Sequence, residues 1–97
     1  MLFAATLEPD GSVVKTRLLV RADAEALRRA GGNVVVVGPD KAANRRLARD
    51  LESTACGPYV TSPPHPNAGP NALPHCQPIN RPPYGHTFYE VDKRKAR

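Results

Sequence analysis

The stretch Gly32-Asn-Val-Val-Val-Val-Gly-Pro-Asp40 decides the fold of this chain. Its four consecutive valines stand between glycines and form a short β-branched run, which is typical of a buried strand. Gly38 and Pro39 end the run, and Asp40 is a residue type that caps the first turn of a helix. The sequence therefore predicts a buried strand that leads directly into a helix running to about Glu52.

Upstream of this stretch, the sequence predicts a hairpin and a first helix. Leu2–Leu7 and residues 12–20 are apolar-rich runs on either side of Glu8-Pro-Asp-Gly11. Because proline fixes its own φ and glycine permits a positive one, this tetrapeptide favours a hairpin turn. Residues 22–30 are good helix formers, with acids first and arginines last as the helix dipole prefers, and two glycines follow them.

The second helix separates its apolar from its basic side chains. The expected core stripe recurs every four residues and comprises Ala43, Leu47 and Leu51. The expected basic row, on nearly the opposite face, comprises Lys41, Arg45 and Arg49, with Arg46 beside them. Such a row is most often a solvated helix face. The alternative is a row of phosphate contacts, because no acid of this helix falls between the cations on their own face.

Residues 57–84 have a different composition, because nine of the 11 prolines fall there. This density excludes a helix and disfavours a central strand. Residues 85–91, Gly-His-Thr-Phe-Tyr-Glu-Val, have the composition of a strand and follow immediately. We therefore expect a long, irregular but ordered loop that carries function, with a disordered linker as the alternative. The basic tail, residues 92–97, is expected to be frayed and to add to nucleic-acid affinity.

Together these elements predict an α+β fold for one small domain over residues 1–97. We expect two helices packed on one face of a short, mainly antiparallel sheet, with the long Pro-rich loop bordering a surface cleft. Residues 32–91 form the expected core. Residues 1–31 are either part of this unit or a connector to a preceding segment.

Composition narrows the classes of function. The chain has 97 residues, with 14 Lys+Arg against 9 Asp+Glu, and its net charge of +5 suggests an anionic partner such as nucleic acid. Few large side chains are available, so a shallow surface site is expected rather than a large closed cavity. The longest apolar run, residues 34–37, is far below the roughly 18 residues that span a membrane. The first residues lack the basic region of a signal peptide.

The two cysteines, Cys56 and Cys76, lie 20 residues apart without metal-binding spacing. We expect free thiols in a reducing compartment, with a disulfide between them as the alternative.

All three histidines lie in the second half of the chain, and they suggest acid–base chemistry. A metal-free ribonuclease needs a base for the ribose 2′-OH, an acid for the leaving 5′-oxygen and a cation for the phosphorane charge. We expect His75 and His86 to be the acid and base. The other candidate site residues are Arg81 and the basic row for phosphate, His65 for substrate binding, and Thr87 and Tyr89 as hydrogen-bond donors. A regular strand directs Thr87 and Tyr89 away from His86, so Tyr89 is expected at the other face or past a bulge.

Two alternatives remain for the histidines. Each of them can simply satisfy loop hydrogen bonds. A zinc site would draw on His65, His75, Cys76, His86 and Cys56, whose spacings match no common zinc motif. We therefore expect no metal and no other cofactor.

Residues 32–91 resemble the C-terminal toxin domain of bacterial polymorphic toxins of the Rhs and contact-dependent growth inhibition type. The resemblance lies in the order of a short strand, a Lys/Arg helix, the loop Asn71-Ala-Leu-Pro-His75 and the ending Gly85-His-Thr-Phe-Tyr89. In similar sequences the loop often has a second histidine after Pro-His-aromatic; here Gln77 occupies that place, and it can bind but cannot transfer a proton.

The resemblance implies the C-terminal part of a larger secreted effector that acts in the cytoplasm of a target cell. Such domains commonly cleave RNA, often tRNA, or DNA, and a cognate immunity protein neutralises them. The positive charge here suggests that the immunity protein is acidic. The alternative from another class is a non-enzymatic basic module that binds nucleic acid or protein through its Pro-rich segment.

Overall fold

The computed structural model describes residues 1–64 and 68–97. Its elements are, in chain order, β1 (Leu2–Leu7), β2 (Val13–Leu19), α1 (Arg21–Arg29), β3 (Asn33–Val36), α2 (Lys41–Cys56), β4 (Tyr59–Ser62), β5 (His75–Pro78) and β6 (Thr87–Tyr89).

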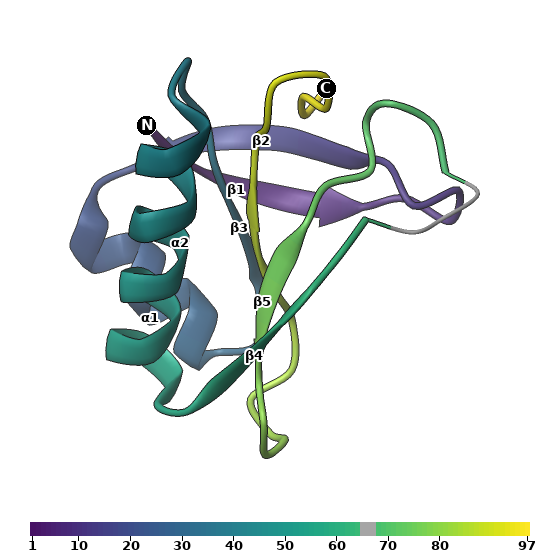
Figure 1. The fold of residues 1–97 in the computed structure, drawn as a ribbon. Helices are drawn as coiled ribbons and strands as arrows, with labels where there is room; N and C mark the ends of the chain where they lie inside the picture. Colours follow the sequence, from purple (N-terminus) through teal and green to yellow (C-terminus); the bar gives the residue numbers. More distant parts are fainter. Residues whose placement is uncertain (65–67) are drawn as a thin grey trace.

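Within the described residues the strands form one six-stranded sheet in the order β2-β1-β3-β6-β5-β4. β3 and β6 pair in parallel, and every other neighbouring pair is antiparallel. Both helices pack on the same face of this sheet (Figure 1). The α+β prediction, with helices on one face of a mainly antiparallel sheet, is confirmed. No helix in this part of the chain is long and apolar enough to cross a membrane.

The valine strand is the centre of the sheet, and its alternation divides the core into two layers. Val34 and Val36 are fully buried in the main core beneath the helices. Val35 points to the other face, where it packs with Phe88 and Leu73 in a smaller core. A continuous apolar run is therefore required, because both faces of β3 are covered.

The predicted hairpin is present between β1 and β2. The Gly11 amide donates to the Glu8 carbonyl at 2.9 Å, and Gly11 has a φ of 90°. The Asp10 side chain accepts from the Ser12 amide at 2.9 Å, which fixes the turn from within.

Helix α2 begins as predicted but ends four residues later and buries a partly different face. Asp40 caps it by accepting from the Ala43 amide at 3.1 Å. The residues buried from α2 are Asn44, Ala48, Leu51 and Glu52. The predicted stripe is confirmed for Leu51 and in part for Leu47, which is half-buried and packs against the main core. It is wrong for Ala43, which is only half-buried, while its neighbour Asn44 is buried. Asn44 is satisfied there because it donates to the carbonyls of Gly38 and Glu90, at 2.9 and 3.1 Å.

The prediction that the Pro-rich segment lacks internal strands is wrong. β4 and β5 both lie in it, and β5 is an inner strand between β6 and β4. The prolines flank or end these strands, so the missing amides do not interrupt the ladder. Their carbonyls still accept: Pro74 from the Tyr89 amide and Pro58 from the Ile79 amide, both at 3.1 Å.

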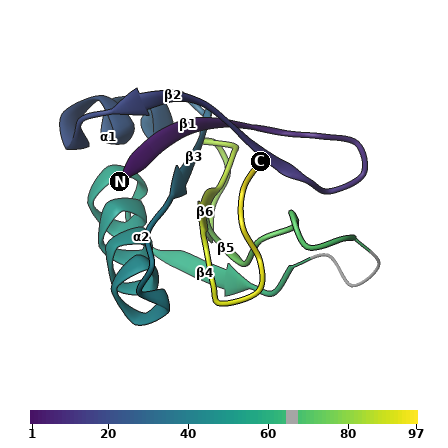
Figure 2. The ribbon, with the colours of Figure 1, turned by 90° about the horizontal axis from the view of Figure 1, so that it is seen from above.

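The basic tail is docked rather than frayed, which corrects the prediction. The Arg97 amide donates to Val13 at 2.9 Å, and the Lys15 amide donates to Arg97 at 2.8 Å. Ala96 is buried, and its amide donates to the Glu90 carboxylate at 2.9 Å. The tail therefore covers part of the sheet face that the helices leave open (Figure 2).

A buried ion pair connects the two helices to each other and to β6 with the segment before it. Arg28 of α1 and Glu52 of α2 have no exposed side-chain area and form two parallel hydrogen bonds of 2.9 Å. Arg28 also donates to the carbonyls of Gly32 and Tyr84, each at 2.8 Å, and Glu52 accepts from Thr87 at 2.6 Å. Each charge is thus bound by several partners, as burial of a charge requires.

We predict that Glu52→Gln destabilises the protein by about 3–5 kcal/mol, because it leaves the Arg28 cation buried without its counter-charge. Asp50→Asn is the matched control on the same helix. Asp50 pairs with Arg21 at 2.9 Å but its side chain is 67% exposed, so we expect a loss below about 1 kcal/mol. Urea unfolding measures both, and equal losses would contradict the prediction.

Candidate functional site

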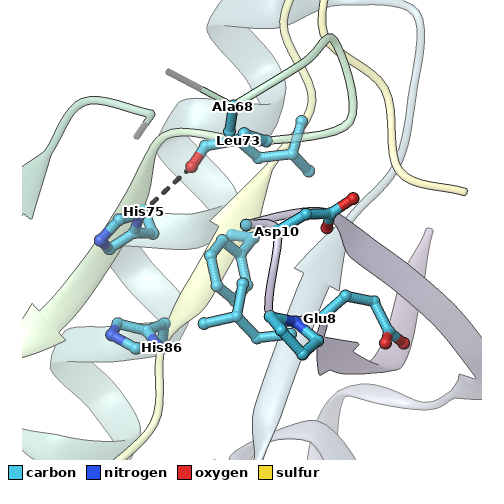
Figure 3. Close-up of a pocket in the computed structure, with 11 residues that line it drawn as sticks. Glu8, Asp10, Ala68, Leu73, His75 and His86 are labelled. Atoms are coloured by element: carbon cyan, nitrogen blue, oxygen red, sulfur yellow. Dashed lines mark hydrogen bonds between the residues drawn. The ribbon is translucent and has the colours of Figure 1, made fainter. Parts of the chain in front are cut away.

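A cleft of about 500 Å³ opens on the face of the sheet opposite the helices (Figure 3). One wall is the β1–β2 turn, residues 7–11, and another is the segment around Ala72 and Leu73 that precedes β5. His75, His86 and Phe88 complete the lining. The Pro-rich segment borders this cleft, as the sequence predicted.

Two adjacent strands bring the histidines together. His75 is the first residue of β5 and lies opposite Phe88 in the β5–β6 register. His86 stands one residue before β6, and its backbone amide donates to the Asn33 side chain at 2.9 Å. The two imidazole rings are edge-to-face with centroids 4.8 Å apart. Phe88 lies 5.2 and 5.3 Å from them and forms an apolar support beneath the pair.

His86 is held in its neutral form. Burial lowers the pKa of its imidazole to about 4, with smaller contributions from the charges of His75, Arg81 and Arg28, while Glu52 opposes them. Its Nε2 lies 3.5 Å from an Nη of Arg81. Arginine has no acceptor, so this contact is a hydrogen bond only in the tautomer with the lone pair on Nε2 and the proton on Nδ1. Nδ1 is buried and has no hydrogen-bond partner among the described residues.

The tautomer of His75 follows from a backbone contact. Its Nδ1 is 3.2 Å from the Leu73 carbonyl, which is drawn as the dashed line in Figure 3. A carbonyl can only accept, so Nδ1 donates there and its proton stays in place. Proton exchange at His75 is therefore assigned to Nε2.

Arg81 supplies a cation beside the histidines. In addition to the contact with His86, its guanidinium donates to the Gln77 side chain at 3.1 Å. Gln77 is two residues along β5 from His75, so it shares the same face. Of the candidate site residues, the structure thus places His75 against His86 and Arg81 beside His86, with Gln77 hydrogen-bonded to the arginine.

Thr87 and Tyr89 lie on the other face of β6, as strand alternation predicts, so their inclusion among the candidate site residues is wrong. The Thr87 hydroxyl is fully buried and donates to Glu52. Tyr89 is 7% exposed and belongs to the core beneath the helices. The cause is the regular alternation of the strand, which directs His86 and Phe88 to the cleft and these two side chains away from it.

The basic row is also apart from the histidines. Lys41, Arg45, Arg46 and Arg49 line a separate shallow hollow of about 300 Å³ on α2. The helix covers the face opposite the cleft, so an arginine of this row does not join the histidine pair. None of the four forms an ion pair with a described residue. The remaining candidate, His65, lies outside the described residues.

The metal alternative receives no support from the geometry. Cys76 is buried beneath the helices, on the face opposite that of His75. Residues 1–64 and 68–97 contain no group of three or more His, Cys, Asp or Glu side chains arranged to hold a metal ion. Cys56 and Cys76 are free thiols, and burial raises the pKa of each to about 11. Neither is a thiolate nucleophile near neutral pH.

Sequence reasoning missed several residues that position this site. The position of Phe88 could be predicted, because a residue two positions after His86 on a strand points to the same face. Those of Asn33 and Arg28 could not, because each acts on a segment more than fifty residues away, through His86 and Tyr84.

We predict that His86 makes stability depend on pH. Its pKa is about 4 in the folded protein against an ordinary 6.5, so between these values the unfolded chain binds more protons. The free energy of unfolding therefore rises with pH through this window, and the contribution of His86 is lost as pH falls from 6.5 towards 4. Urea unfolding of wild type and His86→Gln at several pH values tests this. A difference between the two proteins that stays constant with pH would refute it.

No family model, curated protein or solved structure matches this chain. A functional assignment is therefore based on the side chains that the cleft brings together.

Proposed function

We propose that this domain is a metal-independent ribonuclease toxin in which His86 and His75 transfer protons. The observation that carries the proposal is the histidine pair itself: two imidazoles 4.8 Å apart in an open cleft, with Arg81 beside them. Paired histidines and an adjacent cation are the groups that cleavage of RNA through its own 2′-hydroxyl requires.

In this proposal the two histidines have different roles. His86, whose low pKa keeps it neutral, is the base: Arg81 moves from Nε2 to the incoming phosphate, and Nε2 then accepts the 2′-OH proton. The resulting oxygen attacks the phosphorus, and the bond to the 5′-oxygen breaks. His75 is the proposed acid and donates a proton from Nε2 to that leaving oxygen, while Arg81 stabilises the charge of the phosphorane. DNA lacks the attacking hydroxyl, so this arrangement favours RNA as the substrate.

The basic row on α2 supports a substrate larger than one dinucleotide. Its cations lie on a different side of the molecule from the histidines, and no described residue neutralises them by an ion pair. A folded RNA such as tRNA can contact both places, with phosphates held on α2 while one linkage enters the cleft. Base-independent contacts of this kind position a substrate without selecting its sequence.

The toxin part of the proposal comes from the resemblance over residues 32–91. In this proposal the domain is the C-terminal part of a larger secreted effector and acts in the cytoplasm of the target cell. A cognate immunity protein neutralises it, and the net charge of +5 favours an acidic one.

We predict that His75→Ala and His86→Ala each lower the rate of tRNA cleavage by about 100-fold or more, the usual worth of a positioned acid or base. Purified tRNA and total RNA, resolved on gels, measure the rate, and EDTA leaves it unchanged. Leu18→Ala is the control, because it removes an exposed apolar side chain of β2 that does not line the cleft, and it should cleave at the wild-type rate.

Three results would overturn this assignment. Folded His75→Ala or His86→Ala protein that still cleaves RNA or still kills cells on induction would exclude proton transfer by these residues. Wild-type protein that binds RNA and leaves it whole would favour the non-enzymatic binding module. Loss of cleavage in EDTA, restored by zinc or magnesium, would favour a metal-dependent nuclease.

We predict that the double variant Arg45→Gln/Arg46→Gln weakens tRNA binding. The slope of log Kd against the logarithm of the salt concentration should fall by about one for each cation removed. Cleavage of a dinucleotide, which cannot reach α2, stays at the wild-type rate. Arg17→Gln, an exposed cation on β2, is the control. Loss of dinucleotide cleavage in the double variant would show that these arginines act in the cleft instead.

A further inference from the structure

Tyr84 is the most exposed Phe or Tyr side chain of the protein. Its relative exposure is 60%, whereas Phe88 and Tyr89 are buried at 2% and 7%. The two remaining members of this group, Phe3 and Tyr59, are half-buried. Single exposed apolar side chains are common, and Leu18 and Val20 are as exposed as Tyr84, so exposure alone assigns no role. What the exposure provides is an aromatic ring that a ligand can reach.

The backbone beneath this exposed ring is anchored. The Tyr84 carbonyl accepts from the guanidinium of Arg28 at 2.8 Å, and Arg28 is itself fully buried and paired with Glu52. The next residue, Gly85, packs so closely that an added Cβ would lie 2.7 Å from the same guanidinium. The backbone that carries the ring is therefore held in place, which lowers the conformational entropy lost when a ligand stacks on the ring.

Tyr84 also stands next to the proposed reaction site. The Arg81 guanidinium lies 5.7 Å from the centre of the Tyr84 ring, and an Nη of the same group is 3.5 Å from Nε2 of His86. One cation thus contacts both the exposed ring and the neutral histidine. In a nucleotide the base and the phosphate are similarly close, so a phosphate at Arg81 brings a base within reach of Tyr84.

We propose that Tyr84 is a stacking platform for an unpaired nucleobase beside the scissile phosphate. This inference rests on the proposed function and narrows its substrate to single-stranded RNA or to the unpaired loop of a folded RNA. An aromatic ring next to an arginine is the usual means of holding a splayed base, and it tolerates every base because each has a π-face. Bases inside a duplex are already stacked on one another and do not present that face.

The test measures binding rather than cleavage, so that the two proposals can fail separately. The probe is a short fluorescent oligonucleotide with 2′-O-methyl riboses, which cannot be cleaved through the 2′-oxygen. Stacking on an aromatic side chain contributes about 1–3 kcal/mol per base, so Tyr84→Ala should raise Kd by about 5-fold to 150-fold. Tyr84→Phe keeps the ring and should bind within about two-fold of wild type.

Matched variants distinguish stacking from simple apolar contact. Tyr84→Leu keeps an apolar side chain without a π-face, so it should bind as weakly as Tyr84→Ala. Leu18→Ala should bind like wild type. A blunt-ended duplex of the same oligonucleotide with its complement has no unpaired base, and it should bind equally to all five proteins.

Three outcomes would overturn the inference. They are wild-type affinity in Tyr84→Ala, wild-type affinity in Tyr84→Leu, and an equal loss of affinity for the duplex and for the single strand. Circular dichroism confirms that each variant is folded, as expected for a side chain this exposed. If the oligonucleotide binds through Tyr84 but unmodified RNA stays whole, the stacking inference stands and the ribonuclease proposal falls.

Discussion

The fully buried pair of Arg28 and Glu52 is the interaction on which the rest of the structure depends. Its two charges come from different helices, and their remaining hydrogen bonds reach the carbonyl of Tyr84 and the hydroxyl of Thr87. The last strand and the segment before it are thereby fixed to the helical layer. Gly85 adopts a φ of 87° against the guanidinium, where any side chain would collide. This contact determines where the chain enters β6 and hence where His86 lies.

The two faces of the sheet carry different side chains because neighbouring residues of a strand point to opposite faces. Thr87 satisfies a buried charge on the helical face, while its neighbours His86 and Phe88 form the floor of the cleft. The arginines of α2 lie away from the histidines, and the cation beside His86 is Arg81, from the segment before β6. Arg81 can approach His86 because that segment is anchored by Arg28.

Local signals could be predicted from the sequence, and distant pairings could not. The turn at Asp10 and Gly11, the valine strand and the cap at Asp40 depend on neighbours within a few residues, and all are present. The inner position of β5 depends on pairing with β6, to which no local pattern points. His75 and His86 could be named as a pair from their chemistry, but their shared face follows from the register between those strands.

The low pKa of His86 depends in part on a charge that a bound anion would offset. In the free protein burial, His75 and the charge of Arg81 all disfavour its protonation, so Nε2 keeps its lone pair. A phosphate bound at Arg81 offsets that positive charge and favours a proton on the same imidazole. In the proposed ribonuclease, His86 would thus be a stronger base with a phosphate bound than in the empty cleft. An exposed histidine without the nearby cation would respond less to the ligand, which gives a physical reason for placing a half-buried imidazole beside Arg81.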